Sequence, residues 1–341
     1  MATYKDIQRL TGLSLSTISK HYNGLPVRAK NREAIEAAAA ELGFRVNAFA
    51  RGLRSRRSRT VGVLLPALDN EFHLAIISGL EAALRPDGIS VLVCATRPEP
   101  GEAVEFLRSR MVDGIVAVPS PGDVEALRRA VEQGIPVVSV DWTDTELESD
   151  RVVLDNAGAG AAAARHLADH GHRSFAVVGG DPAISTTRER TAGFLAALAD
   201  RGIEVPDSHV LRGPLTVDSG IEAVERVLSM SQRPTALFAG NYELTVGSLI
   251  ALGDSGLRVG VDLSVIGFDN FDLARVVRPR LTIVEQPTDA IAAEAAALIR
   301  SRLDGTADAA PRIRTLSSRL VVGASVAQMH DRPSERLEDL C

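Results

Sequence analysis

Apolar, strand-like runs alternate with helical stretches along most of this chain. Strands buried in a parallel sheet are apolar on both faces, and each needs a crossover helix to bring the chain back. The alternation therefore predicts an α/β protein with a doubly wound parallel sheet, and its resumption near residue 175 predicts a second lobe of similar construction. The strand-like runs are Val61–Leu65, Ile89–Val93, Ile115–Val118, Val137–Val140, Phe175–Val178, Thr235–Phe238 and Val265–Phe268, and the helical runs between the first four are Ile76–Leu84, Ala103–Arg110 and Val124–Gln133.

Length and composition are those of an ordinary globular protein. The 341 residues are enough for two or three domains, with 45% hydrophobic and 24% charged residues. The first ten residues lack the apolar stretch of a signal peptide, and no apolar run approaches the roughly 20 residues that span a bilayer. We therefore expect a cytoplasmic protein. Two cysteines, Cys94 and Cys341, are too few for a disulfide framework or a four-ligand zinc site.

The two ends of the chain differ sharply in charge. The first 60 residues carry twelve Lys or Arg and four acidic residues, a net charge of +8, so the other 281 residues carry −14 of the total of −6. Such an asymmetry is expected when one end meets a polyanion and the rest stays in solution. Nucleic acid is the first partner that this distribution suggests.

The cationic end has the pattern of three short helices. Thr3 and Asp6 fit a capping box for a helix over Tyr4–Thr11, and Gly12 permits the left-handed turn that would end it. Ser14 can cap a second helix over Leu15–Tyr22. A third helix is expected over Lys30–Leu42, with Gly43 as its left-handed cap.

Two helices joined by a tight turn can form a structural hairpin or a DNA-binding helix-turn-helix. The net charge of +8 favours the DNA-binding motif. In that case the second helix enters the major groove. Its spacing exposes Leu15, Ser16 and Lys20 while Ile18 points inward. Lys20 can reach guanine O6 and N7, Ser16 can donate or accept a hydrogen bond, and Leu15 can contact a thymine methyl group.

The ordered motifs of the chain resemble those of the lactose/galactose repressor family of bacterial transcription regulators. The resemblance runs from Thr3 to about Ser325 through KDIQRLTGLSLSTISKHYNG, ELGFRVNAFARGLRSRRSRTVGVLLPALDNEF, RMVDGIVAVPS, ARHLADHGHRSFAVVGG, RERTAGFLAAL, RPTALFAGN, SVIGFDN and LTIVEQP. It implies a helix-turn-helix headpiece (1–46), a hinge helix and basic linker (47–60), a two-lobed periplasmic-binding-protein-like effector and dimerisation domain (61–329) and a tail expected to be disordered (330–341).

The resemblance also implies a set of DNA contacts. In the hinge, Asn47 would cap a short helix and Leu53 of each subunit would wedge into a minor-groove base step; a plain basic linker is the alternative. The chain departs from the family at Val46, where proline is common, and Gly52 weakens the hinge helix by about 1 kcal/mol. The expected DNA-binding residues are Thr3, Leu15, Ser16, Thr17, Ser19, Lys20, Asn23, Asn47, Ala50, Leu53, Arg54 and Arg57.

Several polar residues follow the ends of predicted strands, where doubly wound folds bind ligands. Carboxylates and an arginine can each form two hydrogen bonds with neighbouring hydroxyls, and Phe72 or Trp142 can cover a sugar ring. Each single Asp or Asn can instead be a turn-capping residue. The family assigns Arg190 to effector binding, and alignment adds Thr186, Gln286 and Arg97; Tyr242 replaces an aspartate that is common in the family. The expected effector-binding residues are Asp69, Asn70, Phe72, Asp141, Thr186, Arg190, Asn241, Asp269 and Gln286.

Two other motifs have less specific explanations. Gly158, Gly160 and Ala163 fit G-x-G-x-x-A, but the first glycine lies four residues beyond the strand end at Leu154, so a simple helix start is favoured over a dinucleotide loop. His166, His170 and His172 could suggest a metal site. Without a cysteine pair or a second carboxylate, surface histidines at a helix end are favoured. We expect neither a metal nor a cofactor.

The sequence therefore predicts a repressor of a carbohydrate-utilisation operon, not an enzyme, that reads palindromic operator DNA as a homodimer. A small sugar-like effector between the lobes would control operator affinity, as inducer or, like a purine, as corepressor. The tail from Met329 lacks the heptad repeat of a tetramer-forming helix. A sugar-binding transport receptor or a nicotinamide-dependent oxidoreductase would leave the basic first 60 residues unexplained.

Overall fold

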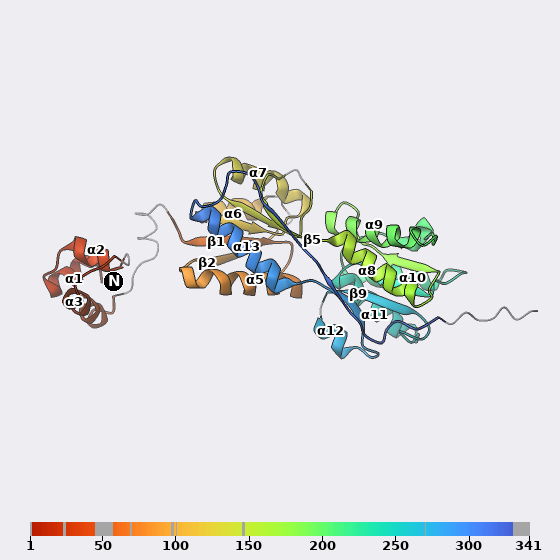
Figure 1. Cartoon of the computed structure of the whole chain (residues 1–341). Helices are drawn as coiled ribbons and strands as arrows, with labels where there is room; N and C mark the ends of the chain where they lie inside the picture. The colour runs from red at the N-terminus through yellow and green to blue at the C-terminus, as the bar shows by residue number, and fades with distance from the viewer. Residues whose placement is uncertain are drawn as a thin grey trace, which may run out of the picture. The chain divides into compact units, whose positions relative to one another are not determined.

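The computed structural model describes residues 2–22, 25–44, 57–68, 70–96, 99, 101–144, 147–269 and 271–329. Its contacts divide the chain into two compact units, Met1–Arg59 and Thr60–Cys341 (Figure 1). Of the expected site residues, Asn23, Asn47, Ala50, Leu53, Arg54, Asp69 and Arg97 lie outside the described residues.

The first unit is a three-helix headpiece, as the sequence predicts. Its helices are α1 (Tyr4–Thr11), α2 (Leu15–Tyr22) and α3 (Ala29–Glu41). The Thr3–Asp6 capping box is present, and Gly12 ends α1 with φ 67°. The core consists of one isoleucine from each helix together with Ala38, and Tyr4 and Tyr22 stack beside it with ring centroids 5.4 Å apart. The buried isoleucines are Ile7, Ile18 and Ile35.

The first lobe of the second unit is a parallel sheet of six strands in the order β11-β5-β4-β3-β1-β2. The strands are β1 (Thr60–Leu65), β2 (Ser90–Ala95), β3 (Gly114–Ala117), β4 (Val137–Val140), β5 (Asp150–Leu154) and β11 (Ile313–Leu316). Helices α5 (Glu71–Leu84) and α13 (Thr288–Leu303) pack on one face, and α6 (Glu102–Ser109) and α7 (Val124–Glu132) on the other (Figure 1). Single 3-10 turns lie at Arg85–Asp87 and Pro121–Asp123.

The second lobe repeats this construction in the order β12-β10-β9-β8-β6-β7. Its strands are β6 (Phe175–Val178), β7 (Val210–Leu211), β8 (Ala236–Ala239), β9 (Ser264–Phe268), β10 (Thr282–Glu285) and β12 (Arg319–Val321). Helices α8 (Asn156–Asp169) and α9 (Ser185–Ala199) cover one face, and α10 (Val217–Leu228), α11 (Tyr242–Asp254) and α12 (Phe271–Val276) the other. A 3-10 turn spans Asp207–His209.

One strand departs from the predicted parallel arrangement. β12 pairs antiparallel with β10. The chain passes from β11 in the first lobe to β12 in the second through residues 317 and 318 alone, so no helix carries it to the far end of the second sheet, from which a strand parallel to β10 would have to start. β11 ends at the lobe boundary, so β12 starts there and runs away from it, opposite to β10. Within the described residues, no helix is long and apolar enough to cross a membrane.

Glycines allow the paired helices of the second lobe to touch. A Cβ atom on Gly160 of α8 would lie 2.0 Å from the Arg190 carbonyl oxygen of α9, and one on Gly193 would lie 2.1 Å from the Ala157 carbonyl oxygen. Gly247 of α11 meets Val217 of α10 in the same way. Helix packing therefore accounts for Gly160 of the G-x-G-x-x-A motif, while the Gly158 amide is bound by the capping carboxylate of Asp155.

The buried carboxylate of Asp150 in β5 ties the start of the edge strand β11 to α13. Asp150 accepts hydrogen bonds from the side chain of Arg302, at 2.7 and 2.9 Å, and from both the backbone and the side chain of Arg312. Burial alone would raise the pKa of Asp150, but these bonds outweigh it and hold the pKa at about 2. The edge strand thus joins the lobe through an ionised, fully paired group.

Candidate ligand cleft and nucleic-acid interface

The second helix of the headpiece presents the side chains that the sequence predicts. Ile18 is fully buried, whereas Leu15 is 39% exposed, and Ser16 and Lys20 are exposed as well. The Ser14 hydroxyl accepts a hydrogen bond from the Thr17 amide, which fixes the start of the helix. The exposed set is therefore held on one rigid face. Thr3 and Arg57 are also exposed, and Thr17 and Ser19 are half-buried.

Every lysine of the chain lies in the headpiece. Lys5, Lys20 and Lys30 are the three lysines of the sequence, and all are exposed. A lysine ammonium is a compact charge with three donors, suited to phosphate oxygens and guanine edges. The headpiece therefore combines an exposed helix face with a concentration of exposed positive charge.

Two aspartates occupy equivalent places in the two lobes. Asp141 directly follows β4 and Asp269 directly follows β9, and both have left-handed backbones with φ 55° and 62°. Each amide donates to the neighbouring strand, Asp141 to the Val152 carbonyl and Asp269 to the Val284 carbonyl. Such a conformation is unfavourable for a residue with a side chain and is found at binding sites more often than elsewhere. It aims both carboxylates past the ends of their sheets.

Arg190 of α9 lies between these aspartates and is 3% exposed. Its Nε donates to Asn156 Oδ1 (2.8 Å) and its Nη1 to the Gly240 carbonyl (3.0 Å). Its Nη2 lies 3.6 Å from Asp141 Oδ1, and the guanidinium centre lies 3.9 Å from the centroid of the Phe268 ring. The arginine is therefore fixed from three sides, with one nitrogen left for a further partner.

Four buried polar atoms of this group have no hydrogen-bond partner among the residues that the structure describes. They are Asp141 Oδ1, Trp142 Nε1, Arg190 Nη2 and Gln286 Oε1. Buried polar atoms are rarely left unpaired, because the loss of their hydration costs about 1–3 kcal/mol each. This combination of donors and acceptors fits a ligand that offers both.

Burial raises the pKa of both cleft aspartates, Asp141 and Asp269. Burial raises the pKa of Asp141 to about 6, although the charge of Arg190 opposes the change. Burial likewise raises the pKa of Asp269 to about 7, against the attraction of Arg190 and a hydrogen bond from Gln286 Nε2 (3.1 Å). Neighbouring carboxyl groups with raised pKa values are typical of functional clefts.

Asn70 and Asn241 both act as helix caps, the alternative that the sequence left open. Asn70 Oδ1 accepts from the Phe72 and His73 amides at the start of α5, and Asn241 Oδ1 accepts from the Leu244 amide at the start of α11. This cap explains why α5 begins five residues before the predicted Ile76. Both side-chain amides also donate to Glu243, at 2.6 Å each.

Glu243 and Asn156 are two residues of this group that the sequence motifs do not predict. Asn156 directly follows Asp155 at the end of β5, so the strand-end rule that found Asp141 could have found it. Nothing in a single sequence marks Glu243, whose role depends on Asn70, 173 residues away in the chain.

The remaining predicted cleft residues are placed as follows. Phe72 is buried in the core of the first lobe and also lines a cavity between the lobes. Trp142 is buried beside Asp141, and Thr186 is buried in the first turn of α9. Gln286 follows β10, where the chain passes between lobes. Thr143 of the first lobe adds contacts with the second, through Ser185 and Glu189.

The three histidines do not gather as metal ligands, and no metal-binding group of His, Cys, Asp or Glu occurs in the described part of the chain. The prediction that all three lie on the surface is wrong for His172, which is 1% exposed and bonded through Nδ1 to Thr235 Oγ1. Burial lowers the pKa of His172 to about 4. It is a neutral core residue because the chain turns inward toward β6 directly after Gly171.

Comparisons with known proteins agree with this arrangement. A family model described as a periplasmic binding protein-like domain matches residues 164–326. Catabolite control protein A of Priestia megaterium is 33% identical over 303 residues, covering 87% of this chain and 91% of that protein. The Lac repressor dimer bound to operator and the anti-inducer ONPF has a TM-score of 0.85 at 25% identity, covering 96% of this chain and 99% of that one. The transcriptional regulator CelR in complex with cellobiose has a TM-score of 0.73 at 28% identity, covering 95% and 100%.

A helix-turn-helix headpiece on a two-lobed, periplasmic-binding-protein-like domain defines a DNA-binding transcription regulator with an effector domain. The chain belongs to the lactose/galactose repressor (LacI) family of transcriptional repressors. The relatives named above are regulators of this kind and not enzymes.

Proposed function

We propose that the chain represses a carbohydrate-utilisation operon and that a small sugar-like effector, bound between the lobes, controls its affinity for operator DNA. The observation that carries the effector site is a group of buried atoms that lack a hydrogen-bond partner among the described residues, on Asp141, Trp142, Arg190 and Gln286. Two of them are donors and two are acceptors. A polyol can pair with all four, because each hydroxyl both donates and accepts.

The chemistry of this group supports a sugar. The Asp141 carboxylate and the Arg190 guanidinium lie 3.6 Å apart, close enough to bind adjacent hydroxyls of one ring. The complex of CelR with cellobiose shows that a relative with the same fold binds a sugar. The residues proposed to bind the effector are Asp69, Asn70, Phe72, Asp141, Thr186, Arg190, Asn241, Asp269 and Gln286, with the first of them outside the described residues.

The headpiece would bind the operator through α2. Leu15, Ser16 and Lys20 face outward together and would read base edges, while Thr3, Thr17, Ser19 and Arg57 would contact the backbone. The proposal assigns further contacts to Asn23, Asn47, Ala50, Leu53 and Arg54, which lie outside the described residues. A DNA-binding regulator of this kind acts in the cytoplasm by binding, without catalysing a reaction.

A homodimer is part of the proposal. An apolar groove of about 780 Å³ lies between α11 and α12 of the second lobe, lined by residues such as Leu249, Ile250 and Val277. Ile250 is 42% exposed, and nearby Val261 and Val276 are 61% and 76% exposed. Exposed apolar patches of this kind usually mark protein interfaces. A second copy of the chain would cover it and bring two headpieces to a palindromic site.

Effector binding would change lobe closure and so couple the cleft to the headpiece, with a coupling free energy of typically about 1–3 kcal/mol. A thermal-shift screen of the purified protein against pentoses, hexoses, disaccharides, sugar phosphates and purines tests the effector class. A ligand at a hundred times its dissociation constant should stabilise the fold by about 2.7 kcal/mol. Stabilisation by a sugar supports the proposal; stabilisation by a purine alone contradicts it and indicates a corepressor.

A further inference from the structure

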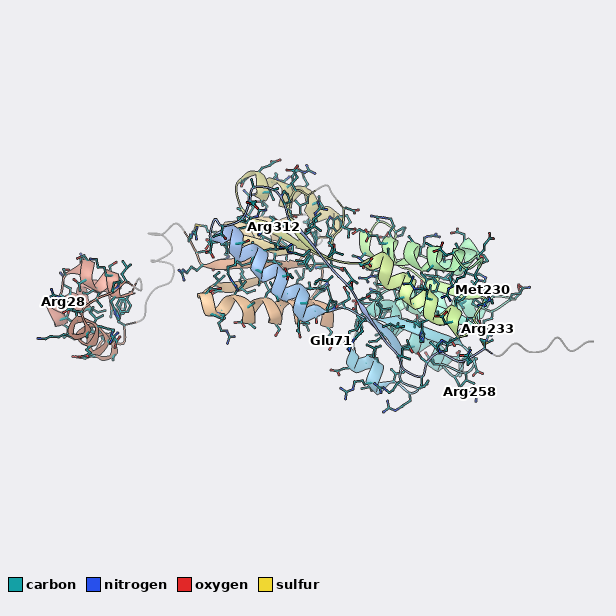
Figure 2. All side chains as sticks on the ribbon, viewed as in Figure 1. Arg28, Glu71, Met230, Arg233, Arg258 and Arg312 are labelled. Carbon is teal, nitrogen blue, oxygen red and sulfur yellow. The ribbon has the colours of Figure 1, made fainter. Side chains whose placement is uncertain are left out.

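A small cavity between the lobes adjoins the proposed effector site. Its volume is about 180 Å³, and it is lined by residues of α5, α11 and α12, by the residue after β9, and by residues at the end of β10 and the start of α13. Phe72 and Gln286 are buried and Asp269 is half-buried, whereas Glu71 and Asp272 lie at its exposed edge. Glu71 is labelled in Figure 2 at the start of α5. Tyr242 also lines the cavity, so two aromatic rings border it.

The lining is acidic. Among the described residues it includes four carboxylates, Glu71, Asp269, Asp272 and Glu285, and neither lysine nor arginine. Glu285 is neutralised by Arg319 at 2.6 Å, whereas the contact of Asp272 with Arg275 is longer, at 3.6 Å, and exposed to solvent. Lysine is absent from the sequence after Lys30. The cavity therefore retains an excess of negative charge.

Arg190 does not remove this excess. Its guanidinium acts on both Asp141 and Asp269, but Glu189 acts on Asp141 and Glu243 acts on Asp269 with the opposite sign. Among the described residues that act on these two aspartates, one arginine is therefore set against two further carboxylates. An anionic ligand such as a sugar phosphate would meet repulsion here, and a cationic group would be attracted.

An unpartnered atom points to the ligand's hydrogen-bonding type. Gln286 is 5% exposed, and its Oε1 has no hydrogen-bond partner among the described residues, while its Nε2 donates to Asp269 Oδ2. The cavity therefore offers two adjacent acceptors, an amide oxygen and a carboxylate, beside Phe72 and Tyr242. An ammonium group has three donors and no acceptor, and aromatic faces attract it.

We infer that the effector carries a positively charged amine, held in this cavity by Asp269 and Gln286, in addition to its hydroxyl groups. The chemical class is an amino sugar. The inference rests on the proposed function, because it concerns a ligand of the same cleft. The high pKa of Asp269, about 7, agrees with a buried carboxyl that needs a cation to stay ionised.

Matched sugar pairs test this inference. Isothermal titration of the full-length protein at neutral pH would compare glucose with glucosamine, galactose with galactosamine and mannose with mannosamine, and each amino sugar with its neutral N-acetyl derivative. For the sugar that binds, we expect the amino form to bind at least tenfold more tightly than both the parent sugar and the N-acetyl derivative. If a neutral sugar binds equally well or better, the inference of an amine is wrong, but the proposal of a sugar effector is unaffected. No binding by any member contradicts the inferred amino sugar, and the thermal-shift screen with pentoses and disaccharides then decides separately whether a sugar effector stands.

Two variants locate the amine. The double substitution Glu71→Gln with Asp272→Asn removes charge from the exposed edge of the cavity and should lower the ratio of amino-sugar to neutral-sugar affinity at least threefold. Asp254→Asn, an equivalent change at an exposed site on the C-terminal end of α11, is the control and should leave the ratio unchanged. An amine preference that persists unchanged in the double variant would place the amine elsewhere and overturn the assignment to this cavity.

Discussion

Asn70 of the first lobe donates a hydrogen bond to Glu243 of the second lobe over 2.6 Å. The second carboxylate oxygen of Glu243 accepts from Asn241, also at 2.6 Å. Both asparagines are fixed by their capping bonds, so their amide nitrogens can only donate toward Glu243. The carboxylate thus joins the first turns of α5 and α11 and links the lobes beside the proposed effector site.

The substitution Glu243→Gln should weaken this link. A glutamine offers one acceptor where two donors point, so one asparagine amide loses its partner. We expect the free energy of unfolding to fall by about 1 kcal/mol and amide hydrogen exchange to rise in the first turns of α5 and α11. Urea denaturation and exchange mass spectrometry measure the two effects. Glu222→Gln on the exposed side of α10 is the control, and equal behaviour of the two variants would show that the link carries no free energy.

Effector affinity should depend on pH through Asp269. The pKa of its carboxyl is about 7 in the ligand-free protein, and ligand donors prefer the ionised form. Binding therefore lowers this pKa, and affinity is lost as pH falls through about 7, by up to about tenfold per pH unit for one proton. Asp141, with a pKa of about 6, adds a second step at lower pH. Titration calorimetry from pH 5.5 to 8 should show the loss in the wild type and a weak, flatter profile in Asp269→Asn. Affinity that rises on acidification would contradict an ionised Asp269 as acceptor.

Helix packing in the second lobe gives a prediction about stability. Gly193→Ala places a Cβ about 2.1 Å from the Ala157 carbonyl oxygen, so α8 and α9 must move apart. Overpacking of this kind costs about 1–3 kcal/mol. Gly253→Ala in α11 meets nothing within 4 Å and should instead stabilise the protein, by up to about 1 kcal/mol. Urea denaturation of the two variants measures both values, and a Gly193→Ala protein as stable as the wild type would refute the close contact.

Lys20 and Arg57 should affect DNA binding in different ways. Lys20 is exposed on α2 among the side chains proposed to read bases, whereas Arg57 belongs to the basic linker. Lys20→Ala should relax base preference at one position of each half-site, by about 1–3 kcal/mol. Arg57→Ala should weaken binding to all sequences alike and reduce the salt slope by about 1. Fluorescence anisotropy on matched and mismatched duplexes separates the two, and an equal loss on every duplex for Lys20→Ala would exclude base reading.

Local rules predicted much of the headpiece. The Thr3–Asp6 capping box, the left-handed Gly12 and the inward-facing Ile18 depend on neighbours within one or two helical turns, and the structure has all three. A local rule also predicted the positions of Asp141 and Asp269, because a polar residue directly after a buried strand must lie at the strand-end side of its sheet.

Features that depend on distant contacts could not be predicted in this way. His172 is buried because of its bond to Thr235, and Glu243 acquires its role from Asn70. The direction of β12 follows from the path of three crossings between lobes, which hydrophobic periodicity does not contain. The need for glycine at position 160 could not be predicted for the same reason, because it depends on the close approach of α9.

The most direct test of a sequence-specific, palindrome-reading repressor is selection of DNA duplexes from a random pool by the purified full-length protein. The enriched duplex is then titrated against a scrambled one at fixed salt. We expect a twofold-symmetric enriched sequence, bound at least about 10³-fold more tightly than the scrambled duplex. Enrichment of no sequence, with equal affinity for both duplexes, would contradict it.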